Sequence, residues 1–269
     1  MGFFDGLKRD TKQARTVEEV DRPQTQEQEV VVAEEEFVDD PENIEVVVRE
    51  VEDYAAPVIP QEPLKSYKDK APVRHVVGQT KIIAIINQKG GVGKSTTAIN
   101  LGAALGEMGK QVLLVDLDPQ GNCSSGLGVE KSLIQQCIYD VLLNDVPLEE
   151  VIIPDIAEGL DIAPATINLA GAEVELVSEM ARENRLKDAV GGMRGKYDFI
   201  LIDCPPSLGL LTVNALVAAD KLLIPIQCEF YALEGVTKLL ESMKRVKSRL
   251  NPTLDIYGIL LTMYDSRTT

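Results

Sequence analysis

Tryptophan is absent from this sequence, and aromatic residues make up only 4% of its 269 positions. The single histidine, His75, has no second histidine or cysteine cluster near it in the chain, so we expect it to play no part in a metal site. The sequence also lacks a hydrophobic run long enough to span a membrane, and it shows no signal peptide. These absences favour a protein of the cytoplasm.

Cysteine is scarce as well, and its spacing argues against the common zinc and redox motifs. None of the four cysteines forms a C-x-x-C pair or shows the spacing of metal ligands. We therefore expect them to be buried thiols in a reducing compartment. They are Cys123, Cys137, Cys204 and Cys228.

Acidic residues outnumber basic ones by 43 to 27, which gives a formal net charge of −16. A chain this acidic is not an obvious nucleic-acid binder, so such a role would need a local basic patch. One basic cluster lies in a predicted helix over residues 232–249, and we interpret it as a solvent-exposed face rather than a DNA contact. It consists of Lys238, Lys244, Arg245, Lys247 and Arg249.

The first 80 residues differ from the rest in composition. They combine acidic runs and six scattered prolines with short valine runs, so they hold too little apolar surface to offset the entropy lost on ordering. We expect a disordered acidic N-terminal tail and linker over residues 1–80; local pairing or docking of the valine runs is the alternative. Phe3, Phe4 and Leu7 share one helical face ahead of several bases, which leaves open a weak membrane contact through residues 2–15.

From residue 81 onward, apolar strands alternate with amphipathic helices. This order predicts an α/β domain over residues 81–269: a doubly wound, mostly parallel sheet with helices on both faces, of the P-loop NTPase type. Gly109 is expected to end the first helix. The predicted strands lie at 81–87, 111–116, 160–164, 197–203, 221–226 and 254–263. The predicted helices lie at 94–108, 132–143, 167–180, 182–191, 208–219 and 232–249.

A glycine-rich loop follows the first predicted strand and precedes the first predicted helix. Its sequence is Lys89-Gly90-Gly91-Val92-Gly93-Lys94-Ser95-Thr96. Between a strand and a helix N-terminus, such a loop directs backbone N–H groups and the positive end of the helix dipole at an anion. In the general phosphate-loop pattern the lysine of the G-K-[ST] end reaches the β- and γ-phosphates and the following hydroxyl ligates Mg²⁺, roles that fall to Lys94 and Ser95. The sequence therefore predicts ATP and Mg²⁺ as ligands of residues 89–96.

Carboxylates end two of the other predicted strands. Asp203 follows Phe199–Ile202 as the expected Walker B acid, and Asp116 is the second acid expected on the Mg²⁺ side. Because ligands of doubly wound sheets bind at the carboxyl ends of strands, both would lie near the loop. Mg²⁺ keeps several of its waters when it is bound, so these acids can hold the ion either directly or through one of those waters. Asp118 is placed to position the attacking water.

The loop departs from the usual pattern in one informative way. Position 88, where the pattern asks for glycine, is Gln88, and a second lysine, Lys89, stands beside it. With the Asp116–Gln120 and Asp203–Ser207 motifs in this order, the chain closely resembles ParA/Soj-type partition ATPases, within the ParA/MinD family of deviant Walker A P-loop ATPases. The resemblance covers residues 81–269 and includes the stretches 229–235 and 261–268.

The resemblance implies specific roles. A slow ATPase would form a homodimer with ATP sandwiched between its subunits, where Lys89 reaches the partner's phosphates while Lys94 and Ser95 act in cis. Asp118 would be linked to hydrolysis, which makes Lys89, Lys94 and Asp118 the expected catalytic set. Family members bind DNA non-specifically, are stimulated by a ParB-type partner, and position or segregate chromosome or plasmid DNA. Association with the nucleoid would follow from this.

Two departures from the family pattern stand out. The acidic tail is not part of the usual short form. The sequence also stops at Thr269, whereas family members continue with a further strand and helices, so we expect a domain that is incomplete at its C-terminus. These departures put DNA binding in doubt for this chain.

Alternatives of other classes remain open. A MinD-like division-site regulator would use the same chemistry on a membrane instead of DNA. An iron–sulfur assembly ATPase would need the C-x-x-C pair that is missing here. A non-hydrolysing ATP-binding scaffold would use the acidic tail to recruit partners.

Overall fold

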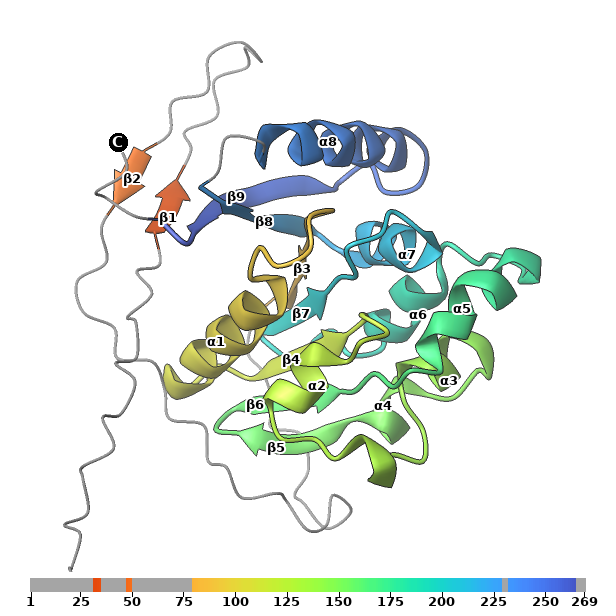
Figure 1. Cartoon of the computed structure of the whole chain (residues 1–269). Coiled ribbons are helices and arrows are strands. Elements are labelled where there is room, and N and C mark those ends of the chain that lie inside the picture. The colour runs from red at the N-terminus through yellow and green to blue at the C-terminus, as the bar shows by residue number, and fades with distance from the viewer. Residues whose placement is uncertain (1–30, 35–46, 50–78, 229–231, 265–269) are drawn as a thin grey trace, which may run out of the picture.

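The computed structural model describes residues 31–34, 47–49, 79–228 and 232–264. Their centre is a sheet of nine strands in the order β2-β1-β9-β8-β3-β7-β4-β6-β5 (Figure 1). The six central strands run parallel, while β5 and β1 pair antiparallel with β6 and β9. The strands are β1 Val31–Glu34, β2 Val47–Arg49, β3 Lys81–Ile85, β4 Val112–Asp116, β5 Ile153–Ala157, β6 Leu160–Ala163, β7 Phe199–Asp203, β8 Lys221–Gln227 and β9 Asp255–Thr262. The prediction of a mostly parallel, doubly wound sheet is confirmed.

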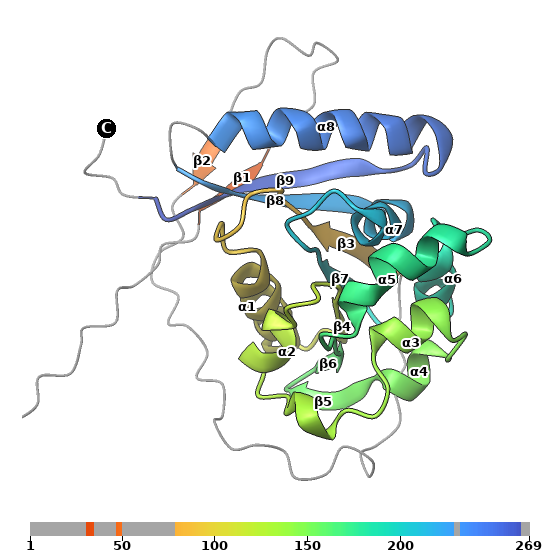
Figure 2. The same ribbon diagram turned by 45° about the vertical axis from the view of Figure 1, so that its right-hand side comes forward.

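The helices cover both faces of this sheet (Figure 2). One face packs against α1 and α2, and the opposite face packs against α3, α5, α6, α7 and α8. The helices are α1 Lys94–Glu107, α2 Asn122–Gly126, α3 Ile138–Leu143, α4 Leu148–Val151, α5 Leu169–Glu175, α6 Arg185–Gly191, α7 Leu210–Ala218 and α8 Ala232–Arg249, with 3₁₀ turns η1 Lys131–Leu133 and η2 Leu176–Ser178. No helix in the described part of the chain is long and apolar enough to cross a membrane.

Strand β3 shows why a central strand of this sheet carries apolar side chains on both of its faces. Ile82 and Ala84 point into the larger core, while Ile83 and Ile85 point into the core under α1. Successive side chains of a strand alternate between faces, so a strand buried on both sides must be apolar at every position. This explains the continuous β-branched run that marked it in the sequence.

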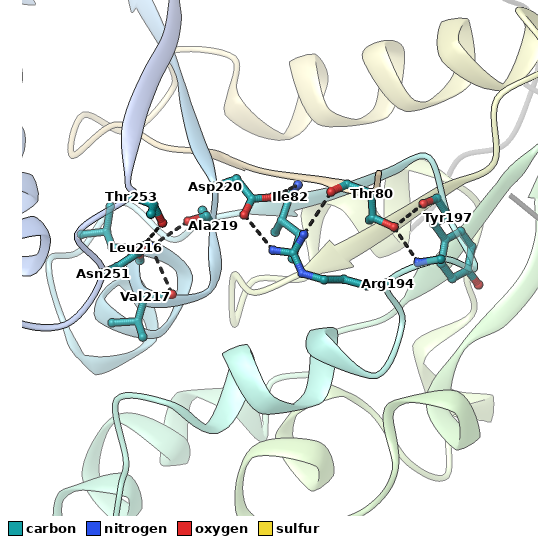
Figure 3. A network of polar contacts seen from close by, with 11 residues as sticks. Thr80, Ile82, Arg194, Tyr197, Leu216, Val217, Ala219, Asp220, Asn251 and Thr253 are labelled. Atoms are coloured by element: carbon teal, nitrogen blue, oxygen red, sulfur yellow. Dashed lines mark hydrogen bonds and ion pairs between the residues drawn. The ribbon is translucent and has the colours of Figure 1, made fainter. Parts of the chain in front are cut away.

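The amino end of the sheet is held by a polar network (Figure 3). The Arg194 guanidinium donates to the Thr80 carbonyl at 3.0 Å and to Asp220 Oδ1 at 2.7 Å, and Asp220 Oδ2 accepts from the Ile82 N–H at 2.9 Å. Thr80 Oγ1 donates to the Tyr197 carbonyl at 2.7 Å. The network therefore fixes the start of β3 against β7 and β8, at the end of the sheet opposite the glycine-rich loop.

Several predicted elements differ in their bounds or were missed. The predicted helix over 132–143 is η1 followed by α3, because Cys137 is extended (φ −143°) and caps α3 with Asp140. The helix over 167–180 is split into α5 and η2, and Ala181 has a positive φ of 53° before α6. Elements α2, α4 and β5 were not predicted, whereas Gly109 has the left-handed conformation (φ 79°) that we expected after the first helix.

Parts of the predictions fall outside the described residues. This applies to residues 1–30, 35–46 and 50–78 of the expected tail, including the segment 2–15. It also applies to positions 229–231 and 265–269 of the two stretches that resemble the family. The runs Val31–Glu34 and Val47–Arg49 pair with each other in the sheet.

Helix α1 approaches the β5–β6 turn so closely that Gly106 has no room for a side chain. A Cβ at this position would lie 2.0 Å from the Glu158 carbonyl oxygen. We expect Gly106→Ala to lower the free energy of unfolding by about 1–3 kcal/mol, although alanine has the higher helix propensity. Urea unfolding measures this.

Gly191 at the end of α6 supplies the matched control, because a Cβ there would meet no atom within 4 Å. Gly191→Ala should be neutral or stabilising by up to about 1 kcal/mol. If Gly106→Ala were as stable as Gly191→Ala, the close approach of α1 to the turn would be wrong.

Candidate functional site

The glycine-rich loop joins β3 to α1 and lies at the carboxyl end of the sheet, beside β8 and β9 (Figure 1). Gly91 and Gly93 have positive φ values of 77° and 86°, a conformation that favours glycine. A Cβ at Gly90 or Gly91 would meet no atom within 4 Å, so the loop faces open space there. Helix α1 begins at Lys94, directly after the loop. The local geometry is that of a cradle for an anion.

Two neighbouring strands hold the loop in this shape. The buried Asn87 side chain donates from Nδ2 to the Pro225 carbonyl of β8 at 2.7 Å, and its Oδ1 accepts from the Lys89 N–H at 3.0 Å. On the other side, Thr262 Oγ1 of β9 donates to the Val92 carbonyl at 2.9 Å. Neither Asn87 nor Thr262 was among the predicted site residues. The position of Asn87 at the end of a strand was the signal for it.

Lys94 turns back under the loop, and its side chain is only 7% exposed. Its Nζ donates to the Lys89 carbonyl at 3.3 Å. Burial lowers the pKa of Lys94, and the charges of Asp203 and Asp118 oppose this shift. The ammonium group is therefore held close to the loop and to the two acids. Its role in binding phosphate stays a prediction.

Asp203 and Asp116 are paired in register at the ends of the adjacent strands β7 and β4. Both are fully buried. Burial raises the pKa of Asp203 from 3.8 to about 6, and it raises the pKa of Asp116 from 3.8 to about 7, with the charge of Asp203 adding to the latter shift. Hydrogen bonds from Ser95 and Cys123 act in the opposite direction on Asp203, as those from Ser124 do on Asp116.

The two acids differ in how their oxygens are used. Asp116 Oδ2 accepts from the Ser124 N–H at 2.8 Å and the Ser124 hydroxyl at 2.7 Å, while its Oδ1 accepts from the Asp118 N–H at 3.2 Å. Asp203 Oδ2 accepts from the Cys123 thiol at 3.1 Å, but Asp203 Oδ1 is buried without a partner. Asp203 therefore has an oxygen to offer a ligand, whereas Asp116 is engaged in holding α2 and the turn before it. A metal contact by Asp116 stays a prediction.

Asp118 lies in that turn and is 6% exposed. Its Oδ1 accepts from the Gln120 N–H at 2.9 Å, which closes a tight turn after β4. The charges of both Asp118 and Asp203 act on Lys94. The structure therefore brings together Lys94, Ser95, Asp116, Asp118 and Asp203, while Lys89 contributes its backbone to the loop and Thr96 is exposed at the start of α1.

The donor set fits Mg²⁺ bound together with phosphate. Ser95 is close enough to Asp203 for its side chain to lower the pKa of that carboxyl, and one oxygen of Asp203 is buried without a partner. The described part of the chain contains no group of three or more His, Cys, Asp or Glu side chains that could hold a metal ion by themselves. Mg²⁺ is commonly bound by one or two protein ligands, waters and substrate phosphates, and this arrangement offers the protein's part of that set.

Comparisons with known proteins find relatives over most of the described domain. A family model described as an AAA domain matches residues 80–256. Over 188 residues the chain is 58% identical to the sporulation initiation inhibitor protein Soj of Bacillus subtilis, covering 70% of this chain and 74% of that protein. Over 187 residues it is 57% identical to the chromosome partitioning protein ParA of Myxococcus xanthus, covering 70% of this chain and 66% of that protein.

Solved structures share the fold as well. Cobyrinic acid a,c-diamide synthase from Mycobacterium smegmatis, with bound ATP analog and magnesium, matches with a TM-score of 0.68 and 46% identity over 71% of this chain and 78% of that one. A plasmid partition protein from Borrelia burgdorferi matches with a TM-score of 0.62 and 31% identity, over 70% of this chain and 81% of that one.

The raised pKa of Asp203 predicts a pH-dependent stability for the nucleotide-free protein. In the unfolded chain this group loses its proton near pH 3.8, but in the folded protein near pH 6. Between these values the folded state binds more protons, so this group's contribution to stability falls as pH rises through the window.

Asp203→Asn removes the charge and keeps the shape. At pH 8 in EDTA we expect the variant to have the higher free energy of unfolding, by about 1–3 kcal/mol, since each pKa unit corresponds to about 1.4 kcal/mol. The advantage should shrink toward pH 5, where the wild-type carboxyl is protonated. Urea unfolding at several pH values measures it, and a difference that does not change with pH would contradict the assignment.

Proposed function

The chain belongs to the ParA/Soj family of P-loop ATPases, and from this premise we propose that it binds ATP with Mg²⁺, hydrolyses it slowly, and dimerises around it to position chromosomal or plasmid DNA. The observation that carries the proposal is the buried cluster of Lys94, Asp118 and Asp203 beneath an open glycine-rich loop. Burying a charged side chain without a partner costs free energy, so a buried cluster of charged residues favours a functional site.

The loop would hold the phosphates through its backbone. Gly90 and Gly91 leave the approach free, and the start of α1 adds the positive end of the helix dipole. Lys94 is held beneath by the Lys89 carbonyl and would exchange this weak 3.3 Å contact for phosphate oxygens. The binding of a triphosphate would thus offset the buried positive charge of Lys94.

Mg²⁺ would supply charge neutralisation for the β- and γ-phosphates. The Ser95 hydroxyl and the free Oδ1 of Asp203 would hold it, directly or through water. Asp118 would orient the attacking water, since phosphoryl transfer to water depends on positioning and charge more than on covalent chemistry. Its carboxylate is kept in place by the Gln120 N–H.

Lys89 is assigned to the second subunit's nucleotide. The loop turns at Lys89 so that its carbonyl serves Lys94 and its N–H serves Asn87. We infer a homodimer in which each Lys89 side chain reaches across to the partner's phosphates. A ParB-like protein is the expected stimulating partner, because the relatives named above include a chromosome partitioning protein and a plasmid partition protein.

The surface on which the dimer would act is inferred from the relatives rather than from a basic face of this chain. The basic cluster of α8 is exposed, but Lys247 lies 3.9 Å from Asp255 and the net charge is strongly negative. DNA is favoured over membrane because one of the curated relatives described above is named as a chromosome partitioning protein. Action in the cytoplasm, on the nucleoid, follows from this choice.

Substitutions in the cluster should separate ATP binding from hydrolysis. Lys94→Ala should weaken ATP binding strongly, because it removes the buried cation of the cradle. Asp118→Ala should retain ATP binding and lower the hydrolysis rate by about 10²-fold, the scale expected for losing the group that positions a proton or water. Binding of a fluorescent ATP analogue and phosphate release measure the two effects.

Lys187→Ala and Asp188→Ala are the matched controls, because both side chains are exposed on α6. They should leave binding and hydrolysis unchanged. A wild-type protein that released phosphate no faster than Lys94→Ala, even with DNA and a ParB-like partner present, would overturn the enzymatic part of the proposal.

Lys89→Ala tests the dimer. It should bind ATP with near wild-type affinity but fail to dimerise, because the side chain is assigned to the partner's nucleotide. Both proteins carry Asp118→Ala as a background substitution, which slows hydrolysis and keeps ATP bound. Light scattering then measures the dimer, and Lys187→Ala is again the control. An intact ATP-dependent dimer in Lys89→Ala would refute the assignment. A dimer of the protein with Lys89 that fails to shift duplex DNA at low salt would contradict DNA as the surface on which it acts.

A further inference from the structure

The first turn of α2 places a thiol against one of the site acids. Cys123 is fully buried, and its Sγ donates to Asp203 Oδ2 at 3.1 Å. A second, longer contact joins the same sulfur to the Ser95 carbonyl at 3.6 Å. Cys123 therefore touches both residues that the proposed function assigns to Mg²⁺.

The other three cysteines, all within the described residues, make different contacts. The Cys204 thiol donates to the Ile202 carbonyl at 3.7 Å, and the Cys137 thiol lies 3.4 Å from the Thr166 hydroxyl. Cys228 is exposed. The contact with a site carboxylate is thus particular to Cys123 and is not a general property of the buried thiols.

The thiol determines which oxygen of Asp203 is available. Oδ2 receives the Cys123 proton, and Oδ1 is left buried without a partner. A carboxylate held through one oxygen has a fixed rotation about its terminal bond, so the other oxygen keeps one direction.

Helix α2 joins the two acids through consecutive residues. Cys123 bonds Asp203 on β7, and Ser124 bonds Asp116 on β4. The turn that carries Asp118 leads directly into this helix, and the Asp118 N–H bonds Asp116. The position of α2 is therefore linked to both strand ends and to the residue assigned to hydrolysis.

We propose that Cys123 is a positioning residue for the metal site: its thiol holds Oδ2 of Asp203 so that Oδ1 is presented to the Mg²⁺ of the bound nucleotide. This rests on the proposed function, in which Asp203 serves that ion. Groups that orient metal-binding side chains by hydrogen bonds commonly change metal affinity when they are removed. A thiol is a weak donor, so the carboxylate can still adjust when the nucleotide arrives.

The test compares ATP affinity with and without Mg²⁺ in the full chain. Cys123→Ala removes the donor, and Cys123→Ser restores one of similar size. We expect Cys123→Ala to bind ATP in EDTA like the wild type, but to lose on the order of ten-fold of the gain in affinity that Mg²⁺ provides. Cys123→Ser should recover most of the gain, a rescue that a purely structural role would not produce.

Cys204→Ala is the matched control, since it also deletes a buried thiol beside Asp203 but one that does not bond the carboxylate. Its Mg²⁺-dependent gain should equal that of the wild type. Equal gains in Cys123→Ala and Cys204→Ala would overturn the inference. A wild type that fails to bind ATP in either condition would instead overturn the proposed function.

A second measurement needs no bound nucleotide. It compares the folded wild-type protein with the folded Cys123→Ser and Cys204→Ala variants. The S–H stretching band of a thiol shifts to lower frequency when it donates to a carboxylate. The infrared difference spectrum between wild type and Cys123→Ser in EDTA should show a strongly shifted band lost from the variant, whereas the difference with Cys204→Ala should show a weakly shifted one. Absence of a strongly shifted band in the wild type would refute the contact itself.

Discussion

Two carboxylates without any exposure to water, Asp116 and Asp203, lie side by side at the ends of neighbouring strands. Burial disfavours both charges and raises the pKa of Asp203 to about 6 and that of Asp116 to about 7, and the charge of Asp203 adds to the shift of Asp116. Parallel pairing of β4 and β7 makes the arrangement unavoidable, because the register that buries the apolar residues of both strands also aligns the two acids. Both acids accept hydrogen bonds from neighbouring residues, Asp116 from Ser124 and Asp118 and Asp203 from Cys123.

The surrounding elements divide that task. Helix α2 supplies hydrogen bonds to both acids, and α1 supplies the buried Lys94 and the Ser95 hydroxyl. The loop between β3 and α1 is in turn fixed by Asn87 and Thr262, so β8 and β9 also contribute to the geometry. Five of the parallel strands thereby influence the geometry of the site, although only β4 and β7 end in predicted site residues and β3 leads into the predicted loop. Substitutions far from the loop can therefore change the site.

Local patterns were sufficient for the loop, the strand-end acids and the alternation of elements. The loop pattern depends on adjacent residues, and strands buried on both faces are recognisable as continuous apolar runs. The roles of Cys123 and Ser124 could not be predicted in this way, because their partners lie 80 and 8 residues away and depend on how β4 and β7 pair. The division of residues 131–143 into η1 and α3 was missed for a similar reason: the apolar spacing continued through a stretch whose backbone is extended at Ile134 and Cys137.

The same physical feature links stability and function. Burying two carboxylates and one ammonium group close together costs free energy, because these groups lose their solvation by water. The free Oδ1 of Asp203 and the weak contact of Lys94 with the Lys89 carbonyl are the two places where this is visible. Both would be relieved by one ligand that carries phosphate oxygens together with a divalent cation. A site of this kind would bind an anion and a divalent cation together more tightly than either one alone, because each would meet groups of the opposite charge or a free acceptor.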